Sequence, residues 1–123
     1  MNRMDRIGME TVIEIEAARE LSYRLGPVEQ IPVGEGRVFE VGATPVAVFR
    51  TRQGGVYATQ AACPHREGPL ADGIIGGGQV VCPLHAYKFD LATGKPVGNE
   101  CGPLRTYPVS VSEGGEILLS YGE

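Results

Sequence analysis

The chain has 123 residues and a formal net charge of -4. This length is enough for one domain with a buried core but too short for two. No apolar run approaches the roughly 20 residues of a membrane span, and no Lys/Arg cluster is long enough to follow a phosphate backbone, so we expect neither a membrane nor a nucleic acid as partner. The first 25 residues lack the apolar core of a secretion signal, and we therefore expect a cytoplasmic protein.

Residues 1–20 are expected to form an N-terminal extension, and its secondary structure has three interpretations. Thr11-Val12-Ile13-Glu14 matches a capping box, and residues 17–21 continue a pattern typical of a short helix. The β-branched side chains of Val12, Ile13 and Ile15 equally favour a strand over residues 11–16. A loose extension is the third possibility, and the sequence does not decide among them.

Residues 21–123 have the composition and spacing of a single β-domain. The chain contains 18 glycines and 9 prolines, which indicates short strands joined by tight turns rather than long helices. Turn residues also separate the runs with high β-propensity. The predicted strands lie at residues 37–41, 46–51 and 56–60, in a hairpin of 73–75 with 79–81, and in a last hairpin of 106–111 with 116–121; residues 90–95 are predicted as a turn and 95–103 as irregular.

Two short stretches contain most of the metal-binding side chains of the chain. They are Cys63-Pro64-His65 and Cys82-Pro83-Leu84-His85, and they use both histidines and two of the three cysteines. Two thiolates and two imidazoles suit a tetrahedral zinc ion or an iron–sulfur cluster with mixed ligands. A two-Cys, two-His zinc finger places its cysteines together and its histidines together, whereas each stretch here supplies one of each.

The predicted hairpin over residues 73–81 explains how the two stretches would meet. Gly76-Gly77-Gly78 at its tip allows a tight turn, so the chain returns antiparallel to itself. One end of the hairpin leads back to His65 and the other leads to Cys82. We therefore expect the two candidate ligand loops to lie side by side.

The order Cys-x-His followed by Cys-x-x-His, with its flanking residues 63–73 and 82–94, resembles the Rieske family. The resemblance extends over residues 21–123. It implies an all-β fold, an antiparallel β-sandwich with a cluster-binding subdomain of two loops. It also implies one 2Fe-2S cluster, with Cys63 and Cys82 holding one iron and His65 and His85 the other. The electron would enter and leave the cluster at the histidine-bound iron.

The residues around the motif differ from those of high-potential respiratory Rieske proteins. By resemblance, those proteins carry a disulfide between the two loops and Ser and Tyr hydroxyls two and four residues after the second histidine. The corresponding residues here are Gly68 and Leu84 for the disulfide and Tyr87 and Phe89 for the hydroxyls. No bridging disulfide can form and at least one hydroxyl is missing, so we expect a reduction potential in the lower half of the family range of about -150 to +300 mV.

The remaining thiol, Cys101, lies outside the motif. We interpret it as a buried small hydrophobe or an idle thiol rather than a ligand or a redox switch. Arg66 and Lys88 lie beside candidate ligands, where they would either attract an acidic partner or remain simple solvated charges.

The resemblance implies electron transfer, with no catalytic residue on this chain and a redox protein as partner. The amino-acid sequence of both loops is similar to that of the small subunit of assimilatory NAD(P)H nitrite reductase. That subunit would work with a large subunit that carries flavin and sirohaem. A free Rieske ferredoxin supplying a ring-hydroxylating dioxygenase or another oxygenase is the alternative. A docking subunit without redox activity is a further hypothesis.

Overall fold

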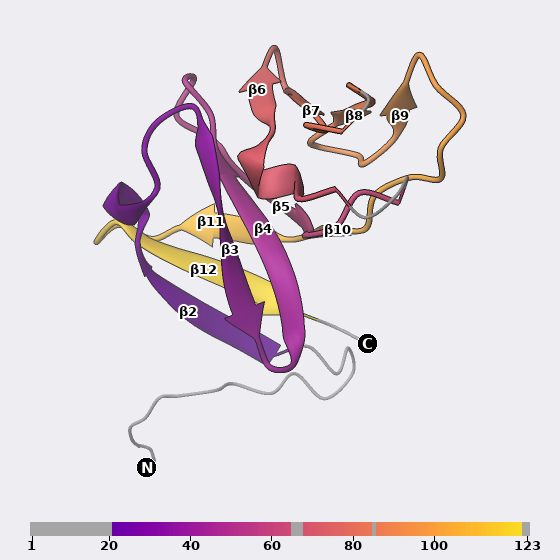
Figure 1. The fold of residues 1–123 in the computed structure, drawn as a ribbon. Helices are drawn as coiled ribbons and strands as arrows, with labels where there is room; N and C mark the ends of the chain where they lie inside the picture. The colour runs from indigo at the N-terminus through magenta and orange to yellow at the C-terminus, as the bar shows by residue number, and fades with distance from the viewer. Residues whose placement is uncertain (1–20, 65–67, 85, 122–123) are drawn as a thin grey trace.

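The computed structural model describes residues 21–64, 68–84 and 86–121, and these residues form β-strands with two single-turn 3-10 helices (Figure 1). The predicted all-β class is confirmed, whereas the helix or strand considered within residues 1–20 lies outside the described residues. The strands are β2 (Leu21–Pro27), β3 (Glu35–Val41), β4 (Thr44–Arg50), β5 (Val56–Gln60), β6 (Ile74–Gly76), β7 (Gln79–Val81), β8 (Lys88–Asp90), β9 (Pro96–Val97), β10 (Thr106–Tyr107), β11 (Val109–Val111) and β12 (Glu116–Tyr121), and the 3-10 helices are η1 (Val28–Gln30) and η2 (Leu70–Asp72).

Three antiparallel sheets make up the fold. One has the strand order β10-β5-β4-β3, the second β11-β12-β2 and the third β6-β7-β8-β9. The first two sheets form the layers of a sandwich, and the third stands apart from them at one end (Figure 1). The predicted arrangement, a sandwich with a smaller subdomain, is therefore confirmed.

Strand β4 is covered on both faces, which makes it the wall between two cores. Val46, Ala47, Val48 and Phe49 are all fully buried. Because side chains alternate along a strand, Val46 and Val48 point to one core and Ala47 and Phe49 to the other. The first, the sandwich core, consists of Ile31, Val41, Val46, Val48, Ala58, Tyr107, Ile117 and Leu119, and the second, the cysteine-side core, consists of Ala47, Phe49, Cys63, Leu70, Ile75, Val80, Cys82, Phe89, Leu91 and Leu104.

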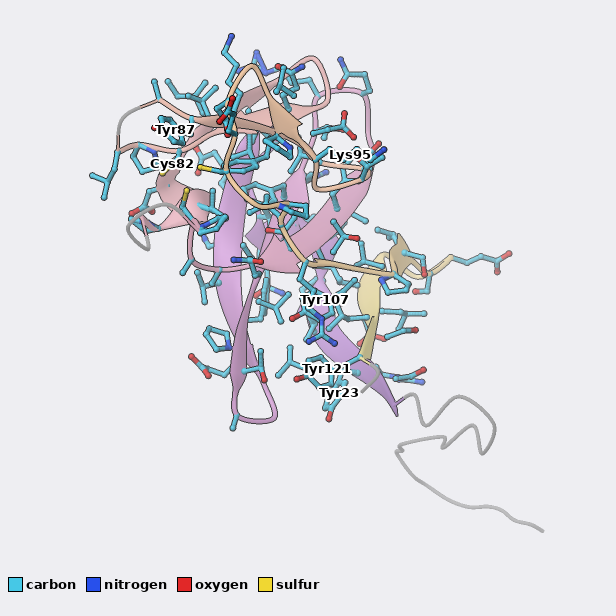
Figure 2. The ribbon with its side chains drawn as sticks, turned by 90° about the vertical axis from the view of Figure 1, so that its right-hand side faces the viewer. Tyr23, Cys82, Tyr87, Lys95, Tyr107 and Tyr121 are labelled. Carbon is cyan, nitrogen blue, oxygen red and sulfur yellow. The ribbon has the colours of Figure 1, made fainter. Side chains whose placement is uncertain are left out.

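Aromatic side chains close the sandwich core at the end away from Cys82 (Figure 2). The rings of Tyr107 and Tyr121 stack with centroids 5.5 Å apart, and the guanidinium carbon of Arg105 lies 5.1 Å and 5.6 Å from the two centroids. Thr44 Oγ1 and the Tyr121 hydroxyl are hydrogen-bonded at 3.0 Å. Burial raises the pKa of Tyr107 above its usual value, and Arg105 acts against that shift. This end of the sandwich is thus packed with rings, far from the cysteines.

A glycine in β3 lets the cysteine-side core dock on the sandwich. A Cβ on Gly36 would lie 2.8 Å from Phe49 Cδ1 and 3.2 Å from the Ala71 carbonyl oxygen. The absence of a side chain therefore allows η2, which contains Ala71, to lie directly against β3. Helix η2 in turn contributes the fully buried Leu70 to the cysteine-side core.

The glycine hairpin forms as predicted. Gly76 pairs with Gln79, so the loop is Gly77-Gly78, and these residues have φ of 59° and 78°. Positive φ at both central positions is the requirement of the turn type that matches the twist of a hairpin. The hairpin is β6 and β7, and its register places Ile74 opposite Val81.

Residues 88–97 contain two strands that the sequence pattern does not indicate. Lys88–Asp90 pairs with β7 and Pro96–Val97 pairs with Lys88 and Phe89, so the predicted irregular segment begins as a strand. The turn between them is as predicted, with Asp90 Oδ2 accepting hydrogen bonds from Thr93 N and Thr93 Oγ1, both at 2.9 Å. These strands are only three and two residues long, too short to show a period of two.

The segment predicted as one strand over residues 106–111 is two strands in different sheets. Thr106 and Tyr107 pair with β5, whereas Val109–Val111 pairs with β12. Pro108 separates them, and a proline has no N–H to continue a ladder. The chain therefore changes sheets at this proline and ties the two layers together.

Candidate metal centre

The two motif cysteines begin loops that are closed in the same way. The Cys63 N–H donates to the Gly68 carbonyl at 2.8 Å, and the Cys82 N–H donates to the Tyr87 carbonyl at 2.8 Å. Each hydrogen bond spans five residues, and in each loop the cysteine is followed by a proline, which holds the cysteine backbone in an extended conformation. The first loop follows β5 and the second connects β7 with β8. The same closing hydrogen bond and the same proline thus hold each cysteine.

Both cysteines are buried in the cysteine-side core. Cys63 is 0% exposed and Cys82 is 1% exposed, and no disulfide joins any of the three cysteines. A Cβ placed on Gly68 of the first loop would lie 2.7 Å from Cys82 Sγ and 3.2 Å from Leu84 Cγ of the second loop. The predicted side-by-side arrangement of the loops is therefore present in the structure.

The second loop contains a residue in an unusual backbone conformation. Ala86 has a φ of 57°, in the left-handed region that residues other than glycine seldom adopt. Such a conformation costs about 1–3 kcal/mol and persists only where the surrounding structure enforces it. The hydrogen bond from Cys82 to Tyr87 spans Ala86, and with Pro83 it fixes the course of the loop.

The candidate ligands divide into those that the structure describes and those that it does not. It brings Cys63 and Cys82 together, whereas His65 and His85, like Arg66, lie outside the described residues. Of the flanking residues, Tyr87 is half-buried against the cysteine-side core and Phe89 is fully buried within it.

Cys101 is half-buried against the same core, and its N–H donates to Asn99 Oδ1 at 2.9 Å. Its assignment as an idle thiol stays a prediction.

Two features of the site are not visible in the motif. The first is the backbone hydrogen bond that closes each loop between residues five apart, because no single residue type indicates the loop conformation that it requires. The need for glycine at position 68 arises from Cys82, fourteen residues away. A glycine three residues after His65 is a signal that a close approach exists, but its partner becomes known only once the loops are placed.

The donor set suits a metal held by thiolates. Two thiol side chains from adjacent loops lie within one apolar core, where two thiolates would carry uncompensated negative charge unless a cation lay nearby. Thiolates are the ligands that iron–sulfur clusters and zinc prefer. The residues present therefore fit a buried metal centre bounded by the two loops.

The sequence profile of the Rieske [2Fe-2S] domain matches residues 22–108. The chain belongs to this family. A Rieske domain binds one 2Fe-2S cluster and transfers electrons. The predicted family, cofactor and fold are thereby confirmed.

Known Rieske proteins resemble the chain over most of their length. Ferredoxin CarAc of Metapseudomonas resinovorans is 39% identical over 79 residues, which are 63% of this chain and 73% of that protein. The ferredoxin of carbazole 1,9a-dioxygenase from Nocardioides aromaticivorans IC177 superposes with a TM-score of 0.72 at 35% identity and covers 80% of this chain and 95% of that one. A Mycobacterium tuberculosis protein named as an NADH-dependent nitrite reductase small subunit gives a TM-score of 0.77 at 23% identity, covering 83% and 96%, and this likeness concerns the fold alone.

Within the described ranges 21–64, 68–84 and 86–121, no helix is long and apolar enough to cross a membrane.

Proposed function

We propose that this Rieske domain is a ferredoxin that carries single electrons to an oxygenase. The proposal rests on one observation: proteins at 35–39% identity, matched over 73% and 95% of their own length, are ferredoxins, one of them the ferredoxin of a dioxygenase. In this proposal residues 21–123 are the Rieske domain, residues 1–20 are an extension, and the protein works in the cytoplasm.

The proposed ligands are Cys63 and Cys82 for one iron and His65 and His85 for the other. When bound, the cluster supplies a centre that accepts and returns one electron. The chain's own contribution is to hold the two sulfurs in an apolar core that excludes water and to fix both loops through the hydrogen bonds to Gly68 and Tyr87.

Replacing either motif cysteine is expected to remove the cluster. Cys63→Ser and Cys82→Ser each eliminate a thiolate, so the purified variants should lack the iron, the sulfide and the visible absorption of the parent protein. Cys101→Ser is the matched control and should retain all three, because Cys101 belongs to neither loop. If the two motif variants kept as much iron as Cys101→Ser, or if all three variants lost it equally, the assignment would be contradicted.

His85→Cys tests the proposed imidazole ligand through the reduction potential. A thiolate in place of a neutral imidazole adds a negative charge to the centre and opposes reduction, so we expect a cluster with a markedly lower midpoint potential. The measurement is a redox titration followed by EPR. A potential equal to that of the parent protein would show that His85 is not a ligand.

The midpoint potential of the parent protein is expected in the lower half of the Rieske range of about -150 to +300 mV, and a value above about +150 mV would contradict this expectation. Hydrogen bonds to the cluster sulfurs raise the potential, and Phe89 is fully buried in the cysteine-side core without a hydroxyl to donate. Gly68 and Leu84 cannot form the disulfide of the high-potential proteins. Protein-film voltammetry at neutral pH gives the value, and a higher potential would remove this argument for a low-potential ferredoxin.

Electron transfer to two acceptors tests the proposed function directly. The chain is reduced with dithionite, desalted without oxygen, and mixed in a stopped-flow instrument with the oxidised oxygenase component of carbazole 1,9a-dioxygenase. In parallel it is mixed with the sirohaem subunit of a nitrite reductase. We expect faster transfer to the oxygenase and no stable complex with either acceptor on gel filtration.

A nitrite reductase small subunit is the second candidate, favoured by the residue sequence of the two loops. It predicts a complex with the sirohaem subunit that survives gel filtration, with faster transfer to that subunit. This result would overturn the ferredoxin proposal.

A further inference from the structure

The outward face of the third sheet, β6-β7-β8-β9, carries a row of side chains that the electron-transfer function does not by itself explain. Ile74 is paired with Val81, Val81 with Lys88 and Lys88 with Val97, so these four residues form one row across all four strands. Directly paired residues lie on the same face of a sheet. The neighbouring row, Ile75, Val80 and Phe89, is buried in the cysteine-side core. We call the outward row Ile74, Val81, Lys88 and Val97 the sheet stripe.

The sheet stripe is apolar apart from one cation. Ile74 is 76% exposed, while Val81 and Val97 are half-buried and Lys88 is exposed. The salt bridges seen in the described part of the chain join Arg24 to Glu116 and Arg37 to Glu35, and neither involves Lys88. The nearest carboxylate along β8, that of Asp90, accepts two hydrogen bonds from Thr93 through Oδ2 and, among the described residues, forms no ion pair with Lys88. The ammonium of Lys88 is therefore available to an external carboxylate.

The stripe lies next to the second cysteine loop. Val81 immediately precedes Cys82, and Lys88 immediately follows Tyr87, whose carbonyl oxygen closes that loop. At the Lys88 end the stripe opens into a groove of about 380 Å³ lined by Ala86, Tyr87, Lys88, Val97, Gly98 and Asn99. The strands that carry it stand outside the sandwich, with the face away from the cysteine-side core turned outward (Figure 1). A protein bound here would lie close to the redox centre.

We propose that the sheet stripe is a docking surface for the redox partner protein, which places apolar side chains on Ile74, Val81 and Val97 and a carboxylate on Lys88. The proposal rests on the electron-transfer function and adds the surface and the chemistry of the partner. Burial of a mostly exposed isoleucine beside a desolvated charge pair provides both affinity and orientation.

Charge complementarity favours a different protein over a second copy of the chain. Two copies packed stripe to stripe about a two-fold axis would bring the same surface, and hence both Lys88 side chains, to one interface. The stripe itself contains no carboxylate, and Asp90, the carboxylate two residues along β8 on the same face, already accepts two hydrogen bonds from Thr93 through Oδ2. A partner with an acidic side chain avoids this repulsion.

Two variants and two matched controls test the surface. Ile74→Lys adds a charge at the most exposed apolar position, and Lys88→Glu reverses the single charge. Val111→Lys and Arg24→Glu make the corresponding changes on exposed residues of the three-stranded sheet. Each variant is checked for iron content, which should equal that of the parent protein. Its midpoint potential is measured as well, because Lys88→Glu places a negative charge near the redox centre and opposes reduction, and the rates are compared after correction for this change in driving force. Each variant is then mixed with the same two acceptors in the stopped-flow instrument.

We expect both stripe variants to transfer electrons about 10-fold more slowly at low salt to whichever acceptor the parent protein reduces faster, and both controls to match the parent. Added salt should slow the parent and speed Lys88→Glu, because it screens attraction in one and repulsion in the other. Rates equal to the parent in both stripe variants would overturn the docking surface, and so would a parent dimer that Ile74→Lys converts to monomer. Faster transfer to the sirohaem subunit would overturn the oxygenase proposal while the surface is still decided by the variants, and transfer to neither acceptor would overturn both.

Discussion

A Gly68→Ala variant is expected to retain its cluster about 10- to 100-fold less well than the parent protein. The added Cβ would lie 2.7 Å from Cys82 Sγ, closer than such atoms approach in proteins, and 3.2 Å from Leu84 Cγ. Either the first loop moves away or the Cys82 sulfur is displaced, and overpacking of this kind costs about 1–3 kcal/mol. The Gly68 carbonyl also accepts the hydrogen bond from Cys63, so a movement of the loop disturbs both cysteines.

Retention of the cluster is measured as the loss of visible absorption in the presence of an iron chelator. Gly76→Ala is the matched control, because a Cβ at Gly76 meets nothing within 4 Å and its φ is not positive. The far-UV circular dichroism of both variants should match the parent, since the change affects the loops and not the sandwich. Equal chelation rates for Gly68→Ala and the parent would show that the two loops separate without cost.

The elements that the sequence predicts well are those determined by local turn chemistry. Strand β5 has the predicted bounds, and the glycine hairpin forms with the positive φ at Gly77 and Gly78 that its sequence requires. The cysteine motif is equally local, because thiol and imidazole lie within four residues of each other in each stretch. The motif is therefore enough to predict the cofactor, which the Rieske profile confirms, whereas the four ligands stay a prediction.

The elements that the sequence does not predict depend on partners distant in the chain. Strands β8 and β9 exist because β7 offers a ladder and because Phe89 packs into the cysteine-side core, not because of a pattern in their own few residues. From the sequence alone, Gly68 is interpreted only as a position where a disulfide is missing. The structure shows that the absence of a side chain on Gly68 makes room for the sulfur of Cys82. The strand pairing and the close approach of the two loops both depend on residues distant in the chain, and a pattern within one short segment does not contain this information.

Strand β4 allows the stability of the cluster site to be separated from that of the sandwich. Phe49 points into the core that contains Cys63 and Cys82, while its neighbour Val48 points into the core between the two sheets. Both side chains are fully buried. Phe49→Ala is expected to lower the free energy of unfolding by about 3–5 kcal/mol and Val48→Ala by about 2 kcal/mol, through loss of buried surface and formation of a cavity.

The two variants should differ in whether the cluster is lost before the sandwich unfolds. In Phe49→Ala the cavity lies beneath the cysteine loops, so the cluster should be lost at a lower guanidinium concentration than the one that unfolds the sandwich. In Val48→Ala the loops keep their support, and both events should occur at the same, slightly lowered concentration. Visible absorption reports the cluster and far-UV circular dichroism reports the strands. Coincident transitions in Phe49→Ala would mean that the two cores unfold as one unit, and that β4 transmits strain between them rather than separating them.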